Sequence, residues 1–236
     1  LVSNLEDLNG LKITHVILCT PSAMHYENIR QIKPYCNKFL VEIPLVCSEK
    51  ELDEVKSIPN LQIFSGFNIR YHPAVIKIRK EIEINKEKIL RVRCQFGERI
   101  LEQHQWDDVD KRYEVTQELG GGVLLTSCHE LDLLTYFLGK AKKVVSIIGN
   151  QLLPIDCEDF ASIITKHKNG AIGEVSLDFI QPTYQRSLQV VTQSRVYSWM
   201  FKKNLVQIEE KGIPGSTFFK FDEYDFNETY ICELDD

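Results

Sequence analysis

The sequence predicts two kinds of sheet in one chain: an α/β part with parallel strands in residues 1–66, and an α+β part with a mainly antiparallel open sheet in residues 67–236. Strand-like and helix-like runs alternate up to about residue 66, and consecutive strand-like runs follow one another from residue 143. With 236 residues, 43% of them hydrophobic, the chain can bury one large core or two modest ones.

The first part alternates strands and helices. Residues 13–19 are rich in β-branched side chains and end at a Thr-Pro turn, which is typical of a buried parallel strand. The other predicted elements are helices at 3–9, 21–32 and 48–58, the last capped by Ser48 with Glu51 as its capping-box partner, and strands at 38–41 and 61–65. Because strand-helix-strand crossovers are right-handed, these elements predict a parallel sheet.

Several polar residues follow these strands directly. Ligands on parallel sheets bind at the carboxyl ends of the strands, where this sequence places Thr20, Pro21, Ser22, His25, Glu42 and Pro44. The alternatives are an ordinary helix start at the Thr-Pro pair and a solvated or capping carboxylate at Glu42.

The second part is organised around three glycines at 120–122. They lead into an apolar-periodic run that stops at Gly139, so residues 118–138 predict a buried helix. His129 and Asp132 are three residues apart and share one face of this helix. The glycines allow a close backbone approach or positive φ. The alternative is a tight turn before a core helix that carries one satisfied histidine.

Other elements of the second part have ordinary signals. A helix is predicted from Pro73 to about residue 86, a strand at 89–96, and a long polar and aromatic loop at 97–119 that we expect to cover a pocket. Later strands are predicted at 144–149, 160–167, 171–179, 186–192, 196–199 and 206–209, with a hairpin turn at 168–170. Such hairpins predict an antiparallel sheet with the 118–138 helix on one face.

Composition excludes some classes of protein. The net charge of -6 and the pI near 5.6 argue against a nucleic-acid surface. No apolar run reaches membrane-spanning length, and the N-terminus does not resemble a signal peptide. The seven cysteines, without a CxxC pair, predict reduced, buried thiols in a cytoplasmic protein, and neither disulfides nor a metal site.

Four stretches together resemble the Gfo/Idh/MocA family of NAD(P)-dependent sugar oxidoreductases. They are the glycines with His129, the strand and loop at 16–25, the Glu42-Ile43-Pro44 segment, and residues 66–73. Two positions depart from the family pattern, because Ile43 replaces its lysine and Thr126 replaces its helix aspartate. The resemblance implies NAD or NADP as cofactor and a sugar, nucleotide sugar or cyclitol as substrate.

The resemblance also implies roles for individual residues. His129 is the expected acid/base catalyst, since a histidine has a suitable intrinsic pKa. The expected substrate-binding residues are Arg70, Trp106, Tyr113, Thr126, Tyr184 and Arg186. For Arg70 the alternative is an anchor of the linker through a carboxylate, and for Arg186 a solvated arginine at a sheet edge. In the family the open sheet face forms a dimer, so a homo-oligomer is expected.

One feature of cofactor-binding domains is missing from the sequence. No strand is followed by a glycine-rich phosphate turn and, about 20 residues on, an acidic residue. We therefore expect a fragment that begins within a Rossmann-type cofactor domain, ends early in a helix starting near residues 225–230, and binds NAD(P) weakly or not at all. Three hypotheses remain open: an oxidoreductase, a non-catalytic binding or assembly module, and a sequence error at Ile43.

Overall fold

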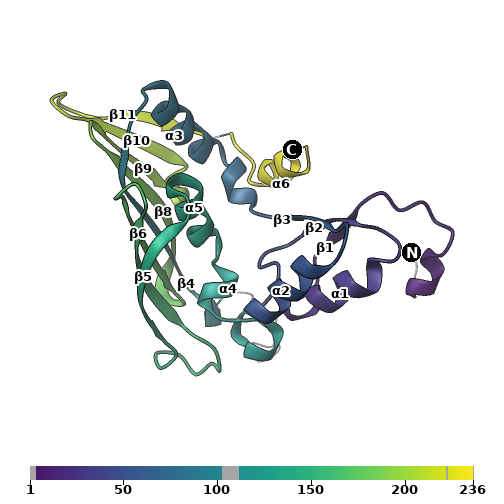
Figure 1. Ribbon diagram of the computed structural model, residues 1–236. Helices are drawn as coiled ribbons and strands as arrows, with labels where there is room; N and C mark the ends of the chain where they lie inside the picture. The colour runs from purple at the N-terminus through teal and green to yellow at the C-terminus, as the bar shows by residue number, and fades with distance from the viewer. Residues whose placement is uncertain (1–3, 103–111, 222, 236) are drawn as a thin grey trace.

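The computed structural model describes residues 4–102, 112–221 and 223–235. The chain forms two parts, one around a three-stranded sheet and one around an eight-stranded sheet (Figure 1). This arrangement confirms the predicted fold class. Within the described residues no helix combines the length and the apolarity that crossing a membrane requires.

The first part is a parallel sheet in the order β1-β2-β3. Its elements are η1 (Leu5–Leu8), β1 (Val16–Leu18), η2 (Ser22–Met24), α1 (His25–Ile32), β2 (Lys38–Val41), α2 (Glu49–Ser57) and β3 (Gln62–Ser65). Every predicted element is present, but β1 is shorter than the predicted strand. β1 is also not buried on both sides, because Ile17 is 55% exposed. The prediction of a fully buried strand was therefore wrong.

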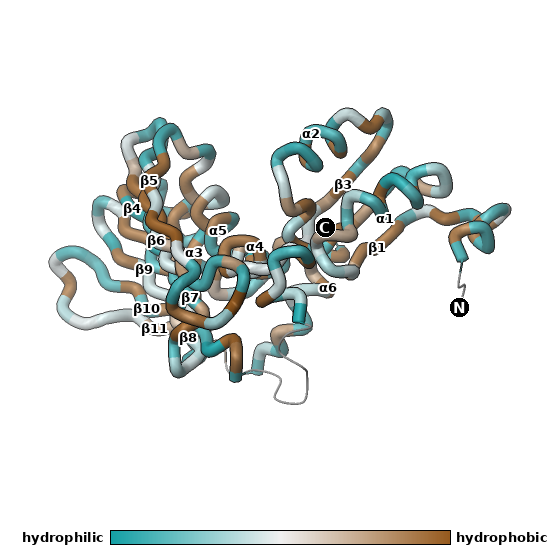
Figure 2. The backbone as a smooth tube through the Cα atoms, turned by 90° about the horizontal axis from the view of Figure 1, so that it is seen from below, coloured by the Kyte–Doolittle hydropathy of each residue, from teal (hydrophilic) through white to brown (hydrophobic). Residues whose placement is uncertain are grey.

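One face of this sheet is covered by helices and the other is open. Leu18, Phe39 and Val41 pack with Ile29 of α1 and Val55 of α2 in one hydrophobic cluster. Because both crossovers are right-handed and the strands follow in sequence order, both helices fall on the same face. In Figure 2, β1 and β3 are largely hydrophobic although no helix covers their second face, whereas α2 is mostly hydrophilic.

Helix α2 begins where the sequence predicts. The Ser48 Oγ accepts a hydrogen bond from the Glu51 backbone N–H at 3.2 Å, which satisfies one free donor of the first turn. The Glu51 carboxylate accepts from the backbone N–H of Cys47 at 3.0 Å, not from Ser48 as in a standard capping box. Glu51 is therefore the predicted capping partner, but its carboxylate bonds to the backbone of Cys47 and not to that of Ser48.

The second part begins with η3 (Asn68–Tyr71) and α3 (Pro73–Ile84). It continues with β4 (Ile89–Arg99), η4 (Ile100–Glu102), η6 (Tyr113–Val115), η7 (Gln117–Leu119), α4 (Val123–Thr126), α5 (His129–Leu138), β5 (Ala141–Gly149), β6 (Phe160–His167), β7 (Ile172–Asp178), β8 (Ile180–Thr192), β9 (Arg195–Met200), η8 (Phe201–Lys203), β10 (Leu205–Glu210), β11 (Thr217–Lys220) and α6 (Asn227–Asp235). Helix α6 returns to the junction of the two parts, where it packs on η3 (Figure 1).

The large sheet has the order β11-β10-β9-β8-β4-β7-β6-β5. Among the described strands, every neighbouring pair is antiparallel except β4 with β7. Gly170 has a φ of +87° in the predicted hairpin turn. Strand β11 was not predicted, and β8 begins six residues before the predicted strand, so that Tyr184 and Arg186 lie inside it and not at its entry.

The large core lies between this sheet and the helices α3 and α5. Its buried side chains include Ile78 of α3, Val92 and Cys94 of β4, Leu133 of α5 and Trp199 of β9.

The prediction that the cysteine thiols are buried was wrong for four of them. Cys19 and Cys232 are exposed, and Cys47 and Cys128 are partly exposed.

The predicted helix at 118–138 is divided into two. Helix α4 ends at Thr126, Ser127 leaves the helical region with φ -112° and ψ 32°, and α5 starts at His129. The Thr126 hydroxyl donates to the carbonyl of Gly122 at 2.8 Å. Serine and threonine side chains compete in this way with the helical backbone bonds, and the helix is interrupted beside them.

Candidate functional site

A cavity of about 290 Å³ lies at the carboxyl ends of β1 and β2. Four predicted cofactor residues and one predicted substrate residue meet there together with Ile43; the complete lining is Cys19, Thr20, Pro21, Ser22, Glu42, Ile43 and Tyr113. The first six come from the two strand ends of the first part, and Tyr113 comes from the second part. The cavity is therefore built by both parts of the chain.

His25 lies beneath this cavity and does not line it. The side chain is fully buried, with Nδ1 2.9 Å from the carbonyl oxygen of Pro44 and Nε2 2.8 Å from that of Thr20. The Thr20 hydroxyl in turn accepts from the side-chain amide of Asn28 at 2.8 Å. His25 thus joins the loops that follow β1 and β2, so its place in the structure is that of a residue that positions the cavity wall.

Glu42 faces a second carboxyl group that the sequence analysis missed. The carboxylates of Glu42 and of Glu233 in α6 converge on Gly66, where an added Cβ would lie 3.3 Å and 3.6 Å from their respective Oε2 atoms. Burial raises the pKa of Glu42. Burial and then the charge of Glu42 raise the pKa of Glu233 to about 7. The inward face of the predicted final helix was the only sequence signal for Glu233.

Tyr113 owes its position to the glycines. Gly121 donates its N–H to the carbonyl of Thr116 at 3.0 Å, and Gly122 donates to the carbonyl of Glu114 at 2.9 Å. An added Cβ at Gly121 would lie only 2.8 Å from both carbonyl oxygens. Gly120 and Gly122 have φ values of +85° and +102°, which confirms the positive φ predicted for this stretch. The close approach made by the glycines is to the protein's own backbone.

His129 is separated from the cavity lining. It is the first residue of α5 and its ring meets the ring of Phe67 edge-on, with 6.3 Å between centroids. Burial and then the nearby Arg186 charge lower the pKa of His129 to about 3. Its Nδ1 is buried without a hydrogen-bond partner. The imidazole is therefore neutral at pH 7.

Arg186 is committed to a buried ion pair. Its Nε donates to Glu130 Oε1 at 2.8 Å, and the two side chains are only 10% and 1% exposed. The guanidinium also lies over the Phe96 ring at 4.7 Å, and Tyr184 meets the same ring edge-on at 5.8 Å. Strand β8 lies between β9 and β4. The alternative of a solvated edge arginine was wrong, because the sheet continues on both sides of β8.

Arg70 takes the role that the sequence analysis gave as its alternative. Its Nε donates to Asp132 Oδ2 at 2.7 Å, and a second guanidinium nitrogen donates to the other carboxylate oxygen. The rings of Phe67 and Tyr136 lie 5.4 Å and 5.3 Å from the guanidinium carbon. This bidentate pair ties the segment after the crossover to α5.

Two predictions remain, one about Trp106 and one about metal binding. Trp106, an expected substrate-binding residue, lies outside the described residues. In the ranges that are described, no group of three or more histidine, cysteine, aspartate or glutamate side chains could hold a metal ion.

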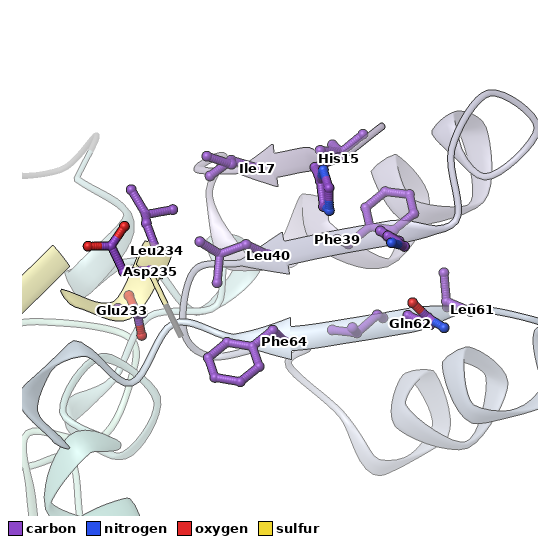
Figure 3. A pocket seen from close by; sticks show the side chains of 13 residues that line it. His15, Ile17, Phe39, Leu40, Leu61, Gln62, Phe64, Glu233, Leu234 and Asp235 are labelled. Atoms are coloured by element: carbon purple, nitrogen blue, oxygen red, sulfur yellow. The ribbon is translucent and has the colours of Figure 1, made fainter. Parts of the chain in front are cut away.

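A larger hollow of about 840 Å³ lies over the uncovered face of the three-stranded sheet (Figure 3). Ile17, Leu40 and Phe64 point into it from the strands, and Leu234 and Asp235 border it from the end of α6. Its floor is the apolar side of a sheet, whereas hydroxyl, phenol and carboxyl groups converge in the smaller cavity. Because specific ligand sites combine an apolar wall with a few convergent polar groups, the smaller cavity is the candidate site.

Comparison with protein families identifies the second part. Residues 87–196 match the family model described as the GFO/IDH/MocA C-terminal domain. This segment is a Gfo/Idh/MocA domain. The family resemblance found in the sequence is thereby confirmed, and the matched residues include the glycines, His129, Tyr184 and Arg186.

Several solved structures share the fold over nearly the whole chain. Levoglucosan dehydrogenase in complex with NADH and levoglucosan superposes with a TM-score of 0.83 at 18% identity, over 98% of this chain and 71% of that one. An inositol dehydrogenase homolog complexed with NAD⁺ from Azotobacter vinelandii gives 0.78 at 18% identity, over 92% and 59%. An NAD-binding oxidoreductase from Klebsiella pneumoniae gives 0.80 at 16% identity, over 98% and 72%. No curated protein matches the sequence.

Proposed function

We propose that the chain serves as an NAD(P)-dependent oxidoreductase that removes hydride from a hydroxyl-bearing carbon of a sugar, nucleotide sugar or cyclitol. The observation that carries the proposal is the cavity at the carboxyl ends of β1 and β2, to which both parts of the chain contribute. The similar solved structures include a sugar dehydrogenase and a cyclitol dehydrogenase homolog, each with a nicotinamide cofactor bound.

The residues present fit one end of such a cofactor. A cavity of about 290 Å³ is at the small end of ligand sites, which span about 300 to 1,000 Å³, so it suits a nicotinamide and not a whole dinucleotide. Thr20, Pro21, Ser22 and Glu42 would hold this end, and His25, bonded to the carbonyls of Thr20 and Pro44, fixes their loops. The bound cofactor supplies the hydride acceptor. Because no glycine-rich phosphate turn occurs in the sequence, affinity for NAD or NADP is expected to be weak.

The site residues divide into proton-transferring and positioning groups. His129 is neutral and has a free Nδ1, so it can accept the proton that leaves the substrate hydroxyl. The two arginines already have buried carboxylate partners. We assign Arg70 and Arg186, with Thr126 and Tyr184, to shaping the substrate side of the site, and assign direct contact with substrate to Tyr113.

The uncovered face of the large sheet supports self-association. Val145 and Ile147 of β5 and Ile164 of β6 point to this face and are 57%, 69% and 56% exposed. Adjacent exposed aliphatic side chains favour a protein interface, and we assign it to a second copy of the chain. Light scattering should give a dimer that Ile147→Lys converts to a monomer; a wild-type monomer would contradict this assignment.

A non-catalytic binding or assembly module is the second candidate. It is favoured by Ile43, which cannot carry a proton, and by Thr126, whose hydroxyl is already bonded to the Gly122 carbonyl. The low pKa of His129 also makes it a weak base. The two candidates differ in one measurable property, which is turnover.

The deciding experiment has two steps. NAD⁺ and NADP⁺ are titrated into the chain while its tryptophan fluorescence is recorded, and nicotinamide reduction is then followed at 340 nm with levoglucosan, L-sorbose and myo-inositol. Turnover that His129→Ala lowers by about 10²- to 10⁴-fold, and that the exposed control His15→Ala leaves unchanged, supports the oxidoreductase. Turnover unaffected by His129→Ala removes His129 from the mechanism. Binding without turnover, even in Ile43→Lys, favours the module.

A further inference from the structure

Proton transfer in the candidate cavity needs a group that faces its interior. Ile43 contributes only hydrocarbon, and the Thr20 hydroxyl accepts a bond from Asn28. His129 belongs to the neighbouring cluster around Phe67 and Arg186 and does not line the cavity. Three lining side chains carry an ionisable proton, Cys19, Glu42 and Tyr113, and Tyr113 is the one that the second part of the chain contributes. It lies near enough to Glu42 for the carboxylate charge to act on the phenol.

The phenol of Tyr113 is available as a donor. Among the described residues, none forms a hydrogen bond with the hydroxyl group of Tyr113. Burial and the negative charges of Glu114, Glu42 and Glu98 raise its pKa to about 12, against the opposing charge of Arg112. The group therefore keeps its proton at pH 7, and Tyr113 lines the cavity.

The backbone beneath Tyr113 is held in place independently of any ligand. Besides the bonds from Gly121 and Gly122, the Cys157 thiol donates to the Glu114 carbonyl at 3.7 Å. Val115 is buried in the core of the second part. Tyr113 thus lines the cavity from a fixed turn of the second part, together with Ile43 and the strand ends of the first part. Such preorganisation is what a proton-transferring group requires.

We infer that Tyr113 is the proton-donating residue of this cavity, bonded to the reacting oxygen of the substrate, and that Gly121 is its positioning residue. The inference rests on the proposed function, and it gives the direct proton exchange with substrate to Tyr113 in place of His129. In the direction of carbonyl reduction, the carbonyl carbon gains hydride from the reduced nicotinamide, and the carbonyl oxygen takes the proton of Tyr113 as the Oη–H bond breaks. The phenolate then regains a proton from water. In the direction of oxidation the phenol first gives its proton to water, and the phenolate then takes the proton of the substrate hydroxyl as hydride leaves the same carbon.

The test uses Tyr113→Phe in the full chain, which removes one oxygen and keeps the ring. Tyr35→Phe is the matched control, since Tyr35 lies in the turn after α1, at the amino end of β2 and away from the cavity. With levoglucosan and NAD⁺ or NADP⁺, Tyr113→Phe should lower single-turnover hydride transfer by about 10²- to 10⁴-fold. Calorimetry should show levoglucosan binding about 5- to 10-fold more weakly, because one hydrogen bond is lost. Tyr35→Phe should change neither.

The outcomes separate this inference from the proposed function. If the unchanged chain turns over none of the three polyols, the proposed function fails and this inference fails with it. If the unchanged chain is active and Tyr113→Phe keeps its rate within twofold, only the assignment of Tyr113 is overturned. Gly121→Ala gives a second arm: it should lower the rate while levoglucosan binding weakens to the same extent as in Tyr113→Phe, and an unchanged rate in a folded Gly121→Ala protein removes Gly121 as a positioning residue.

Discussion

The unchanged chain should lose stability as the pH rises through 7, and replacing Glu233 with glutamine should remove this loss. The pKa of Glu233 is raised from 4.5 to about 7 by burial and by the charge of Glu42. Its folded pKa exceeds its unfolded pKa, so the folded state binds more protons between these values. The contribution of this group to stability is complete below pH 4.5 and is lost as the pH rises through 7.

The magnitude follows from the size of the shift. A displacement of about 2.5 pKa units, at 1.36 kcal/mol per unit, corresponds to about 3 kcal/mol of unfolding free energy between pH 4.5 and pH 8. A glutamine at this position stays neutral, and its amide can donate to the Glu42 carboxylate. The variant should therefore lack this component of the pH dependence.

Urea denaturation at pH 5 and pH 8 measures the effect. The unchanged chain should lose up to about 3 kcal/mol more than Glu233→Gln between the two pH values. Glu228→Gln, at an exposed position of the same helix, should follow the unchanged chain. Equal pH dependence in the unchanged chain and in Glu233→Gln would show that the pKa of Glu233 is not raised in the folded chain, and would refute the reasoning.

Three further substitutions test the buried ion pair of Arg186, the glycine turn and the cap of α2. Arg186→Met leaves the Glu130 carboxylate buried and unpaired, so thermal and urea unfolding should show a loss of about 3 to 5 kcal/mol; a loss below 1 kcal/mol would mean that water reaches this pair. Gly121→Ala forces a Cβ against three carbonyl oxygens, those of Tyr113, Glu114 and Thr116, and should cost about 1 to 3 kcal/mol by the same assay. A neutral result would show that the turn can move. Ser48→Ala removes the cap of α2 and should cost about 1 kcal/mol, whereas Ser57→Ala at the other end of α2 serves as its control.

Local signals in the sequence determined most of the secondary structure. Strand β2 has the predicted bounds, α2 begins at its predicted cap, and the hairpin at Gly170 has positive φ as expected. These features depend on residues within a few positions of one another, which the sequence displays directly. The glycines at 120–122 and the family resemblance were found in the same way, and both parts of the fold follow from them.

Two predictions were wrong because the local sequence pattern is compatible with two structures. An apolar-periodic run from the glycines to Gly139 is compatible with one helix or with two, and a break at Ser127 leaves the periodicity of α5 unchanged. The burial of β1 could not be inferred either, because a run of β-branched residues does not say whether a second layer covers the sheet.

The sequence by itself determined the alternation of elements, the caps and turns, the family, and the residue types available at the strand ends. Only the tertiary structure decided which charges pair: Arg186 with Glu130, 56 positions apart, and Arg70 with Asp132, 62 positions apart. It alone brought Tyr113 and Ile43 to one cavity, set the His129 ring edge-on to Phe67, and brought Glu233 of the last helix close to Glu42. The physical reason is that burial and charge pairing depend on distances between segments, and these distances exist only once the sheets and helices have packed.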